Sequence, residues 1–372
     1  MFMLLGDQII PNLIPFLQLN IDGVVLVTTR DLPLKYATEN LYNYLLQSGL
    51  SENKIWYCKG TKTDLATTVS ACNNLIEQLK TEIPTELEFI FNMSSGTKIM
   101  ALAFYRLTEE TGGRLIYLDS DRDLILELLP EVKEHNLGVQ LKVADYLAAH
   151  GYTIIRDVKS SDSSTYINKR KAAKILAQAL PTTVSTLAKS IQYKGQLSTL
   201  NVESVPQALE LAKCLEGILW HLHISSENKI TIEFLHEADF FPGGKWLEYY
   251  ALDCAQEVND KIGYLLTDVK AGLELSSRNG LSNEIDLAFT WGHHFALCSC
   301  KVGHKAESEW LYDLNDRARS LGSFCRKILL VNFDTHGATQ FRERAKRDNI
   351  ILLDGRDLLK LTEKLQYIVK PH

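Results

Sequence analysis

The sequence lacks any hydrophobic run of the ~18 residues that a membrane-spanning helix needs. Its first residues, MFMLLGDQIIPNLIPFL, have neither a basic region nor a small-residue cleavage site, so they do not predict a signal peptide. We interpret them as a first strand followed by a loop. These absences predict a cytoplasmic protein that does not interact with membranes.

Paired cysteines are missing as well. There are seven cysteines, an odd number, and none forms a CxxC pair. Several of them lie in apolar patterns. Such cysteines are typical of reduced, buried thiols in a cytoplasmic protein.

The chain has no excess of positive charge, because 46 acidic residues outnumber 40 basic ones and the net charge is −6. It therefore has no global attraction for nucleic acid, and any such contact must come from a local basic patch or a metal site. In other respects the composition is ordinary. With 45% hydrophobic and 23% charged residues among 372, it predicts a soluble globular protein of two or three domains.

Two nucleotide-binding fingerprints are absent. Without GxGxxG, classical NAD binding is not expected, and without GxxxxGK[ST], neither is a Walker A ATPase. The first 130 residues instead alternate strand-like and helix-like runs, which predicts a mostly parallel, Rossmann-like sheet. The expected strands are 2–6, 23–29, 54–58, 87–93 and 114–119, the expected helices are 34–49, 63–80 and 96–110, and 123–129 is an expected edge hairpin.

The rest of the chain divides into two parts. Helical patterns dominate up to residue 240, over 139–151, 168–180 and 205–222, and predict a connecting or winged-helix-like segment. From residue 241 the expected order is helix, strand, strand, strand, helix, strand, helix, strand, helix, which is a mixed α/β domain. The expected domains are therefore 1–135, 136–240 and 241–372.

The stretch NEIDLAFTWGHHFALCSCK, residues 283–301, predicts a hairpin with its turn at 291–294. Side chains alternate along a strand, so Glu284 and Asp286 share one face. A loop of two or four residues sets Thr290 opposite Phe295 in an antiparallel register.

Counting back from that pair places Asp286 opposite Ser299 and Glu284 opposite Lys301, with Cβ atoms about 5 Å apart. One interpretation is a cross-strand ion pair between Glu284 and Lys301 on a solvated sheet face. Another is a cluster of acids around one lysine that serves chemistry.

The preceding helix adds a third acid to this second interpretation. Glu248 lies on an apolar helix stripe, and an acid there should be paired, protonated or bound to a cation. Carboxylates that converge with one lysine suit metal-assisted phosphodiester hydrolysis, and oxygen ligands select Mg²⁺ or Mn²⁺. The stripe consists of Gly244, Glu248, Ala251, Leu252 and Ala255.

The arrangement resembles the PD-(D/E)xK restriction-endonuclease superfamily, in which a helix bears Glu, a strand bears Asp and the next strand bears (D/E)-x-K. Glu248, Asp286 and Lys301 match these elements. The resemblance implies that the backbone carbonyl of Cys300 is a metal ligand. The sequence departs from the pattern at Ser299, where an acid is expected.

Under this resemblance Glu248, Glu284 and Asp286 hold the metal, and Glu284 supplies the carboxylate that Ser299 lacks. Lys301 positions the attacking water or the scissile phosphate, and Ser299 contacts a metal-bound water.

In the first domain, small polar residues follow two expected strands. Thr28, Thr29 and Arg30 follow one, and the turn Ser95-Gly96-Thr97-Lys98 leads from another into a helix. A glycine-containing turn that opens a helix exposes backbone N–H groups, and the carboxyl ends of parallel strands are where α/β sheets bind ligands.

Together, LLGDQIIPNLIPFL, the Thr28-Thr29-Arg30 turn and NMSSGTK look like the CARF domain, the CRISPR-associated Rossmann fold. With the nuclease pattern, the chain resembles the CARF–nuclease fusions of type III CRISPR systems. The resemblance implies a cytoplasmic homodimer whose two CARF domains bind one cyclic oligoadenylate, most often cyclic tetra-adenylate, which activates cleavage of DNA or RNA. The implied activator pocket is lined by Gln8, Thr28, Thr29, Ser95, Gly96, Thr97 and Lys98.

The expected fold is thus α/β, with an N-terminal Rossmann-like CARF domain and a C-terminal restriction-endonuclease-like domain. Two other functions stay open: a ligand-sensing regulator whose nuclease lobe is degenerate, as Ser299 favours, and a CARF domain that cleaves its own activator. Arg342, Arg344 and Arg347 form either a solvated helix face or contacts to a nucleic-acid backbone.

Overall fold

The computed structural model describes residues 1–6, 8–29, 32–157, 164–192, 197–200, 206–224, 230–235, 240–241, 243–262, 266–277, 280, 282–322 and 324–369. The chain forms two compact units, which are considered separately. Unit 1 comprises Met1–Thr153 and Ser320–Phe324, and unit 2 comprises Ile154–Arg319 and Cys325–His372. None of the helices in these described ranges is long and apolar enough to cross a bilayer.

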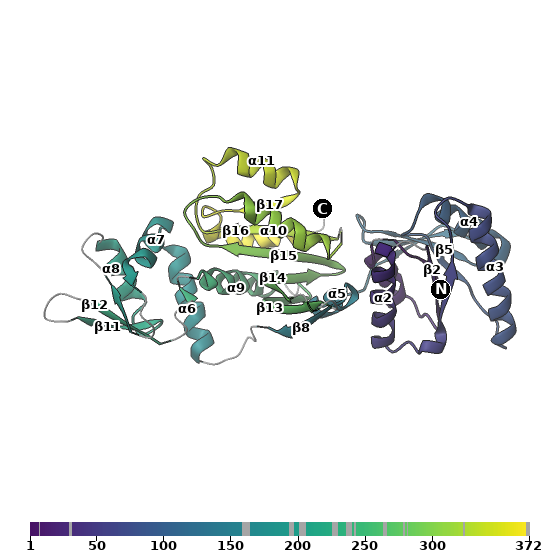
Figure 1. Ribbon diagram of the computed structural model, residues 1–372, viewed down its shortest axis with the longest axis horizontal. Helices are drawn as coiled ribbons and strands as arrows, with labels where there is room; N and C mark the ends of the chain where they lie inside the picture. Colours follow the sequence, from purple (N-terminus) through teal and green to yellow (C-terminus); the bar gives the residue numbers. More distant parts are fainter. Residues whose placement is uncertain are drawn as a thin grey trace. The chain divides into compact units, whose positions relative to one another are not determined.

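The described strands of unit 1 form one sheet in the order β3-β2-β1-β4-β5-β6-β7 (Figure 1). The first five strands are mutually parallel, whereas β6 and β7 continue the sheet as an antiparallel edge. The Rossmann-like prediction is therefore confirmed, as is the edge hairpin. The strands are β1 (Phe2–Leu4), β2 (Val24–Thr28), β3 (Ile55–Lys59), β4 (Ile90–Asn92), β5 (Arg114–Asp119), β6 (Leu124–Leu129) and β7 (Lys133–Asn136).

Helices cover both faces of this sheet. The apolar faces of α3 and α4 pack on Phe2, Leu4 and Phe91, whereas α2 lies on the other side (Figure 1). The helices are α1 (Ile10–Gln18), α2 (Leu32–Gln47), α3 (Leu65–Glu82), α4 (Lys98–Thr111) and α5 (Val143–Ala149), with a short 3-10 turn at Glu52–Lys54.

Helix α1 lies where the sequence predicted a loop, and it contains two prolines. Pro11 is in the first turn, where a missing N–H has no consequence. Pro15 has no N–H to donate to the carbonyl of Pro11, and the side chain of Asn92 donates to that carbonyl instead, at 2.9 Å. The loop prediction was wrong because a distant residue satisfies the freed acceptor.

The main sheet of unit 2 has the order β17-β16-β15-β14-β13-β8. From residue 241 onward, the predicted order of helices and strands is confirmed. The strands are β8 (Tyr152–Arg156), β13 (Asp268–Ser277), β14 (Ser282–Trp291), β15 (His294–Lys301), β16 (Cys325–Val331) and β17 (Ile350–Leu353). The helices are α9 (Lys245–Ile262), α10 (Ser308–Arg319), α11 (Thr339–Arg347) and α12 (Leu361–Val369), with a 3-10 turn at Leu358–Lys360.

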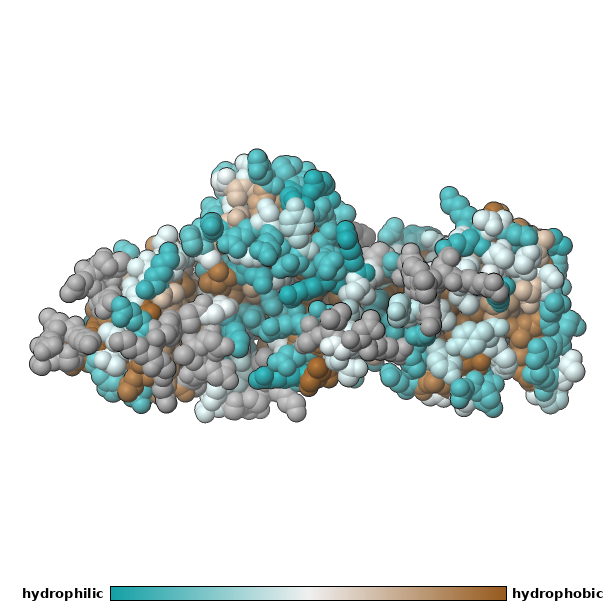
Figure 2. All heavy atoms as spheres, in the orientation of Figure 1, coloured by the Kyte–Doolittle hydropathy of each residue, from teal (hydrophilic) through white to brown (hydrophobic). Residues whose placement is uncertain are grey.

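Helix α9 packs its apolar stripe against the sheet and belongs to one large hydrophobic cluster with α6 and α12. Helix α10 contacts β16, and α11 contacts both α10 and β17. On the face shown in Figure 2 the surface over α10 and α11 is mainly hydrophilic, as amphipathic helices on the outside of a sheet require.

Between β8 and α9, helices alternate with a small antiparallel sheet of order β11-β12-β10-β9. The predicted helix over 205–222 was wrong in its second half. It ends at Cys214, Gly217 has a φ of +72°, and Trp220 begins a strand. These elements are α6 (Ser164–Gln178), α7 (Pro181–Ser190), β9 (Ile191–Gln192), β10 (Leu197–Leu200), α8 (Pro206–Cys214), β11 (Trp220–Ile224) and β12 (Ile230–Phe234).

Candidate functional sites

The hairpin of unit 2 has the predicted register. Gly292, with a φ of +56°, helps to form a tight turn between β14 and β15, and Thr290 pairs with Phe295. The described pairs of this ladder run from Trp291–His294 to Leu287–Cys298.

Beyond the pair Leu287–Cys298, the side chain of Asp286 accepts hydrogen bonds from residues of β15. Its Oδ2 accepts the backbone N–H of Cys300 at 2.6 Å and the hydroxyl of Ser299 at 3.1 Å. Asp286 and Ser299 therefore meet as predicted. In an extended strand the N–H and C=O of one residue point to the same side, so the carbonyl of Cys300 also points toward β14.

Glu248 lies in the first turn of α9, close in sequence to the buried residues Leu247 and Ala251. Its pKa is raised to about 8, chiefly by burial and then by the negative charges of Asp286 and Glu284. Lys301 acts in the opposite direction, since its positive charge favours the ionised carboxylate. The structure thus brings the three predicted acids and the lysine close enough to affect one another.

The donor chemistry of these residues suits a hard divalent cation. All three acids offer carboxylate oxygens. A cation among them would counteract the burial and the negative charges of Asp286 and Glu284, which together raise the pKa of Glu248. In the described part of the chain, no ion pair links Glu284 to Lys301.

Sequence reasoning missed Arg317, which lies in the last turn of α10. Its Nη1 donates to the backbone carbonyl of Glu284 at 2.5 Å. Glu284 precedes the described ladder pairs between β14 and β15, so this bond fixes the strand beside the acids. No local sequence pattern predicts such a contact, because the two residues are 33 positions apart.

In unit 1 the strands β2 and β3 lie on one side of β1, and the later strands β4 and β5 lie on the other. The strand order therefore switches between β1 and β4, and α/β sheets form ligand crevices at such a switch point. A side-chain carbon on Gly6 would lie 2.6 Å from Ser95 Oγ and 3.1 Å from Gly96 N. One on Gly96, whose φ is +77°, would lie 2.9 Å from Leu4 Cβ. Glycines at these positions let the two strand ends approach closely and leave backbone N–H groups accessible.

The turn before α4 is held by its own hydrogen bonds. Thr97 caps the helix by accepting from the N–H of Met100 and also donates to the carbonyl of Lys62, both at 3.3 Å. Gly96 and Lys98 are exposed. Thr97 therefore shapes the predicted pocket, whereas its exposed neighbours reach solvent where a ligand would bind.

The other predicted pocket residues lie at neighbouring strand ends. Thr28 ends β2 and its hydroxyl donates to the carbonyl of Thr29 at 3.0 Å, and Gln8 follows β1. Arg30 lies outside the described residues. The structure thus brings together strand ends of β2, β1 and β4, as the activator prediction requires.

Two buried asparagines beneath these strand ends were also missed. Asn12 donates to the carbonyl of Leu4 at 2.7 Å, and Asn92 donates to the side-chain oxygen of Asn12 at 3.0 Å. Both side chains are fully buried. An asparagine that ends an apolar strand run was the available signal.

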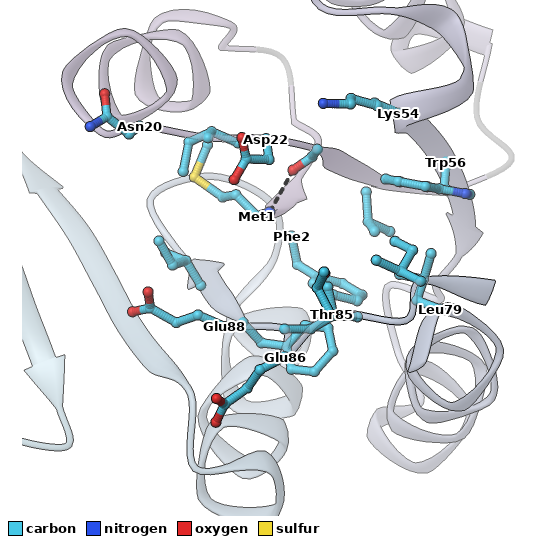
Figure 3. A pocket seen from close by; sticks show the side chains of 17 residues that line it. Met1, Phe2, Asn20, Asp22, Lys54, Trp56, Leu79, Thr85, Glu86 and Glu88 are labelled. Carbon is cyan, nitrogen blue, oxygen red and sulfur yellow. Dashed lines mark hydrogen bonds between the residues drawn. The ribbon is translucent and has the colours of Figure 1, made fainter. Parts of the chain in front are cut away.

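A cavity of about 560 Å³ lies at the opposite, amino-terminal edge of the sheet (Figure 3). Phe2 and Trp56 contribute to its apolar part, and the carboxylates of Asp22, Glu86 and Glu88 lie around it. An acidic cavity repels a phosphodiester ligand. The carboxyl edge is therefore the better candidate for an anionic activator.

Residues 1–146 match the family described as the Card1 CARF domain, so this part of the chain is a CARF domain. No curated protein matches the chain by sequence.

Solved structures share the fold of the whole chain. Can2 from Sulfobacillus thermosulfidooxidans in complex with cyclic tetra-adenylate is 21% identical, with a TM-score of 0.76 over 99% of this chain and 96% of its own. Protein VC1899 from Vibrio cholerae is 18% identical, with a TM-score of 0.81 over 100% and 97%. A type III CRISPR defence DNA nuclease activated by cyclic oligoadenylate is 15% identical, with a TM-score of 0.53 over 89% of this chain and 45% of its own.

Proposed function

We propose that this protein is a cyclic-oligoadenylate-activated, metal-dependent nuclease of type III CRISPR defence. The observation that carries the proposal is the convergence in unit 2: Asp286 bonds to the Cys300 N–H, and Glu248 is partly buried beside Asp286 and Glu284. The CARF domain supports the activator, and the fold shared with Can2 and with a nuclease activated by cyclic oligoadenylate supports the pairing of the two activities.

Glu248, Glu284, Asp286 and the carbonyl of Cys300 would hold Mn²⁺ or Mg²⁺. Such an ion supplies a Lewis acid and lowers the pKa of a bound water. Glu248 must lose its proton before it can bind a cation, and Asp286 is held in place by its two donors.

Lys301 provides the positive charge of the site. Its ammonium would orient the attacking water or stabilise the charge that develops on the phosphate. Ser299 donates to Asp286 and fixes the orientation of that carboxylate, and in this position it would also contact a metal-bound water.

The activator would be bound by two copies of the carboxyl edge of unit 1. A cyclic tetra-adenylate has a two-fold arrangement of phosphodiesters, which suits the isologous interface of a homodimer. Backbone N–H groups at Gly96, the N-terminus of α4 and the exposed Lys98 offer the donors and charge that phosphates need.

A regulator with an inactive nuclease lobe is the second candidate, and Ser299 favours it. A serine contributes no negative charge where the superfamily has an acid, which lowers the expected affinity for metal. Under this alternative the chain binds the activator and nucleic acid without cutting.

Cleavage assays separate the two candidates. Plasmid DNA and single-stranded RNA are incubated with Mn²⁺, with and without cyclic tetra-adenylate. The nuclease predicts activator-dependent cleavage that is lost in Asp286→Asn and Lys301→Ala and retained in Glu309→Gln, an exposed acid in the first turn of α10. An intact protein that binds cyclic tetra-adenylate but cuts neither substrate supports the regulator.

A further inference from the structure

Five residues between α10 and β16 do not belong to the unit that surrounds them in sequence. The chain is part of unit 2 up to Arg319 and again from Cys325, but Ser320–Phe324 is part of unit 1. This segment therefore connects, through the chain itself, the last turn of α10 with the interior of unit 1.

The segment is anchored by buried contacts in unit 1. Leu321 is only 3% exposed, and its carbonyl accepts the hydroxyl of the fully buried Tyr146 at 2.8 Å. The ring of His150 stacks on Tyr146 with centroids 4.7 Å apart. A buried tyrosine hydroxyl needs a hydrogen-bond acceptor, and this bond gives the segment a specific position in unit 1.

Gly322 brings the segment against the candidate activator pocket. It has a φ of +80°, and a side-chain carbon there would lie 2.7 Å from Gln8 Oε1 and 3.3 Å from His150 Nε2. Only glycine fits this conformation and this space without a shift. Gln8, which would contact the activator, therefore packs directly on the segment.

On its other side the segment continues into the residues that hold the metal centre. Arg317 is three positions before Ser320, in the last turn of α10, and donates to the carbonyl of Glu284. Directly after the segment, Cys325 begins β16 and pairs with Phe295 of β15. A displacement of the segment would thus shift both β14 and β15, the strands that carry candidate metal ligands.

We infer that Ser320–Phe324 couples occupancy of the activator pocket to the geometry of the metal centre, with Arg317 as the positioning residue that sets Glu284. The inference rests on the proposed function. When an activator changes the contact between Gln8 and Gly322, the anchored segment moves α10, and Arg317 moves the backbone of Glu284. Because such coupling is reciprocal, metal must change the affinity for the activator by the same factor as the activator changes the affinity for metal.

The test measures binding alone. The affinity of the full-length protein for cyclic tetra-adenylate is determined by calorimetry with Mn²⁺ and with EDTA. We expect the two affinities of the wild type to differ at least about fivefold. In Tyr146→Phe, which removes the anchor, we expect the ratio to fall below twofold. Tyr44→Phe, at another buried tyrosine of unit 1, should keep the wild-type ratio.

A second pair of variants guards against simple loss of folding. Gly322→Ala should also bring the ratio of the activator affinities with Mn²⁺ and with EDTA below twofold. Its control is Gly49→Ala, where φ is +93° but no atom lies within 4 Å of the added carbon. Arg317→Gln should leave unchanged the affinity for the activator that is measured in EDTA. It should weaken Mn²⁺ binding at least about fivefold.

The outcomes are distinguishable. If the wild type binds both ligands but shows equal activator affinities with Mn²⁺ and EDTA, the coupling is absent while the nuclease proposal stands. The same holds if folded Tyr146→Phe and Gly322→Ala keep the wild-type ratio. If the wild type binds neither cyclic tetra-adenylate nor Mn²⁺, the proposed function and this inference fail together.

Discussion

At the scale of single residues, Glu248 carries an electrostatic penalty in the candidate metal centre. Burial and two neighbouring acids hold its pKa at about 8, so at neutral pH the metal-free carboxyl is mostly protonated. A group in this state binds a cation only by releasing a proton. Its position is unfavourable for stability and suitable for metal binding.

Glu248→Gln should separate these two properties. The amide resembles the protonated acid and never ionises, so metal-free Glu248→Gln should melt at a higher temperature than the wild type at pH 8.5. Because a metal ligand is lost, the affinity for Mn²⁺ should fall at least about tenfold. Thermal unfolding in EDTA and calorimetric Mn²⁺ titration measure both effects, and Glu309→Gln should change neither.

His150 supports a prediction about acid stability. Burial lowers its pKa to about 4, and its Nδ1 lies 2.8 Å from the carbonyl of Tyr146. The unfolded chain takes up a proton near pH 6.5 and the folded chain only near pH 4, so the free energy of unfolding falls as pH decreases between these values. The group's contribution is about 3 kcal/mol.

Urea unfolding at pH 7.5 and pH 5 measures this contribution. His150→Gln should lose part of the difference between the two pH values, and His304→Gln, at an exposed histidine, should keep all of it. An unchanged pH dependence in folded His150→Gln would contradict the role assigned to burial.

At the scale of elements, the sequence predicted what depends on alternation and turns. The strands of unit 1 and the pairing of Thr290 with Phe295 follow from side-chain periodicity and a glycine in the turn. It did not predict where the β14–β15 ladder ends, because that depends on Asp286 capturing a backbone N–H and on Arg317, which comes from a different helix. Helix α1 was missed for the same kind of reason, since Asn92 satisfies the acceptor that Pro15 leaves open.

The close approach of β1 and the turn before α4 gives a second element-scale prediction. Gly6→Ala would place a carbon 3.1 Å from Gly96 N and force the turn away. We expect a loss of stability of about 1–3 kcal/mol, as for overpacking in general, and at least tenfold weaker binding of cyclic tetra-adenylate. Gly337→Ala, with no atom within 4 Å of the added carbon, is the matched control.

At the scale of the whole molecule, the net charge of −6 gives no general attraction to polyanions, so both proposed ligands depend on local features. For the activator these are backbone donors and Lys98 at one sheet edge, and for the substrate they are a cation and Lys301. Both candidate sites could be proposed from the sequence, because their residues follow expected strands or lie on one expected strand pair and the helix before it. The sequence did not place the contribution of Ser320–Phe324, which neighbours the activator edge only after folding.

The proposed homodimer leads to a stoichiometric prediction. If two CARF edges enclose one ring, calorimetry should give one cyclic tetra-adenylate per two chains, and the mass in solution should be twice that of the 42.1 kDa chain. Linear tetra-adenylate should bind more weakly, because it loses more conformational freedom on binding. A stoichiometry of one ring per chain would contradict a shared pocket.

The buried place of Leu321 also limits how this protein can be divided. A gene fragment ending at Thr153 would encode every strand of the CARF sheet but not the carbonyl that accepts the Tyr146 hydroxyl, nor the side chain that fills the neighbouring apolar site. Recombination at a single point would therefore give a sensor domain in which the Tyr146 hydroxyl lacks this acceptor and the site of Leu321 is unfilled. Lineages that exchange effector lobes by such crossovers would have to transfer this five-residue insert as well.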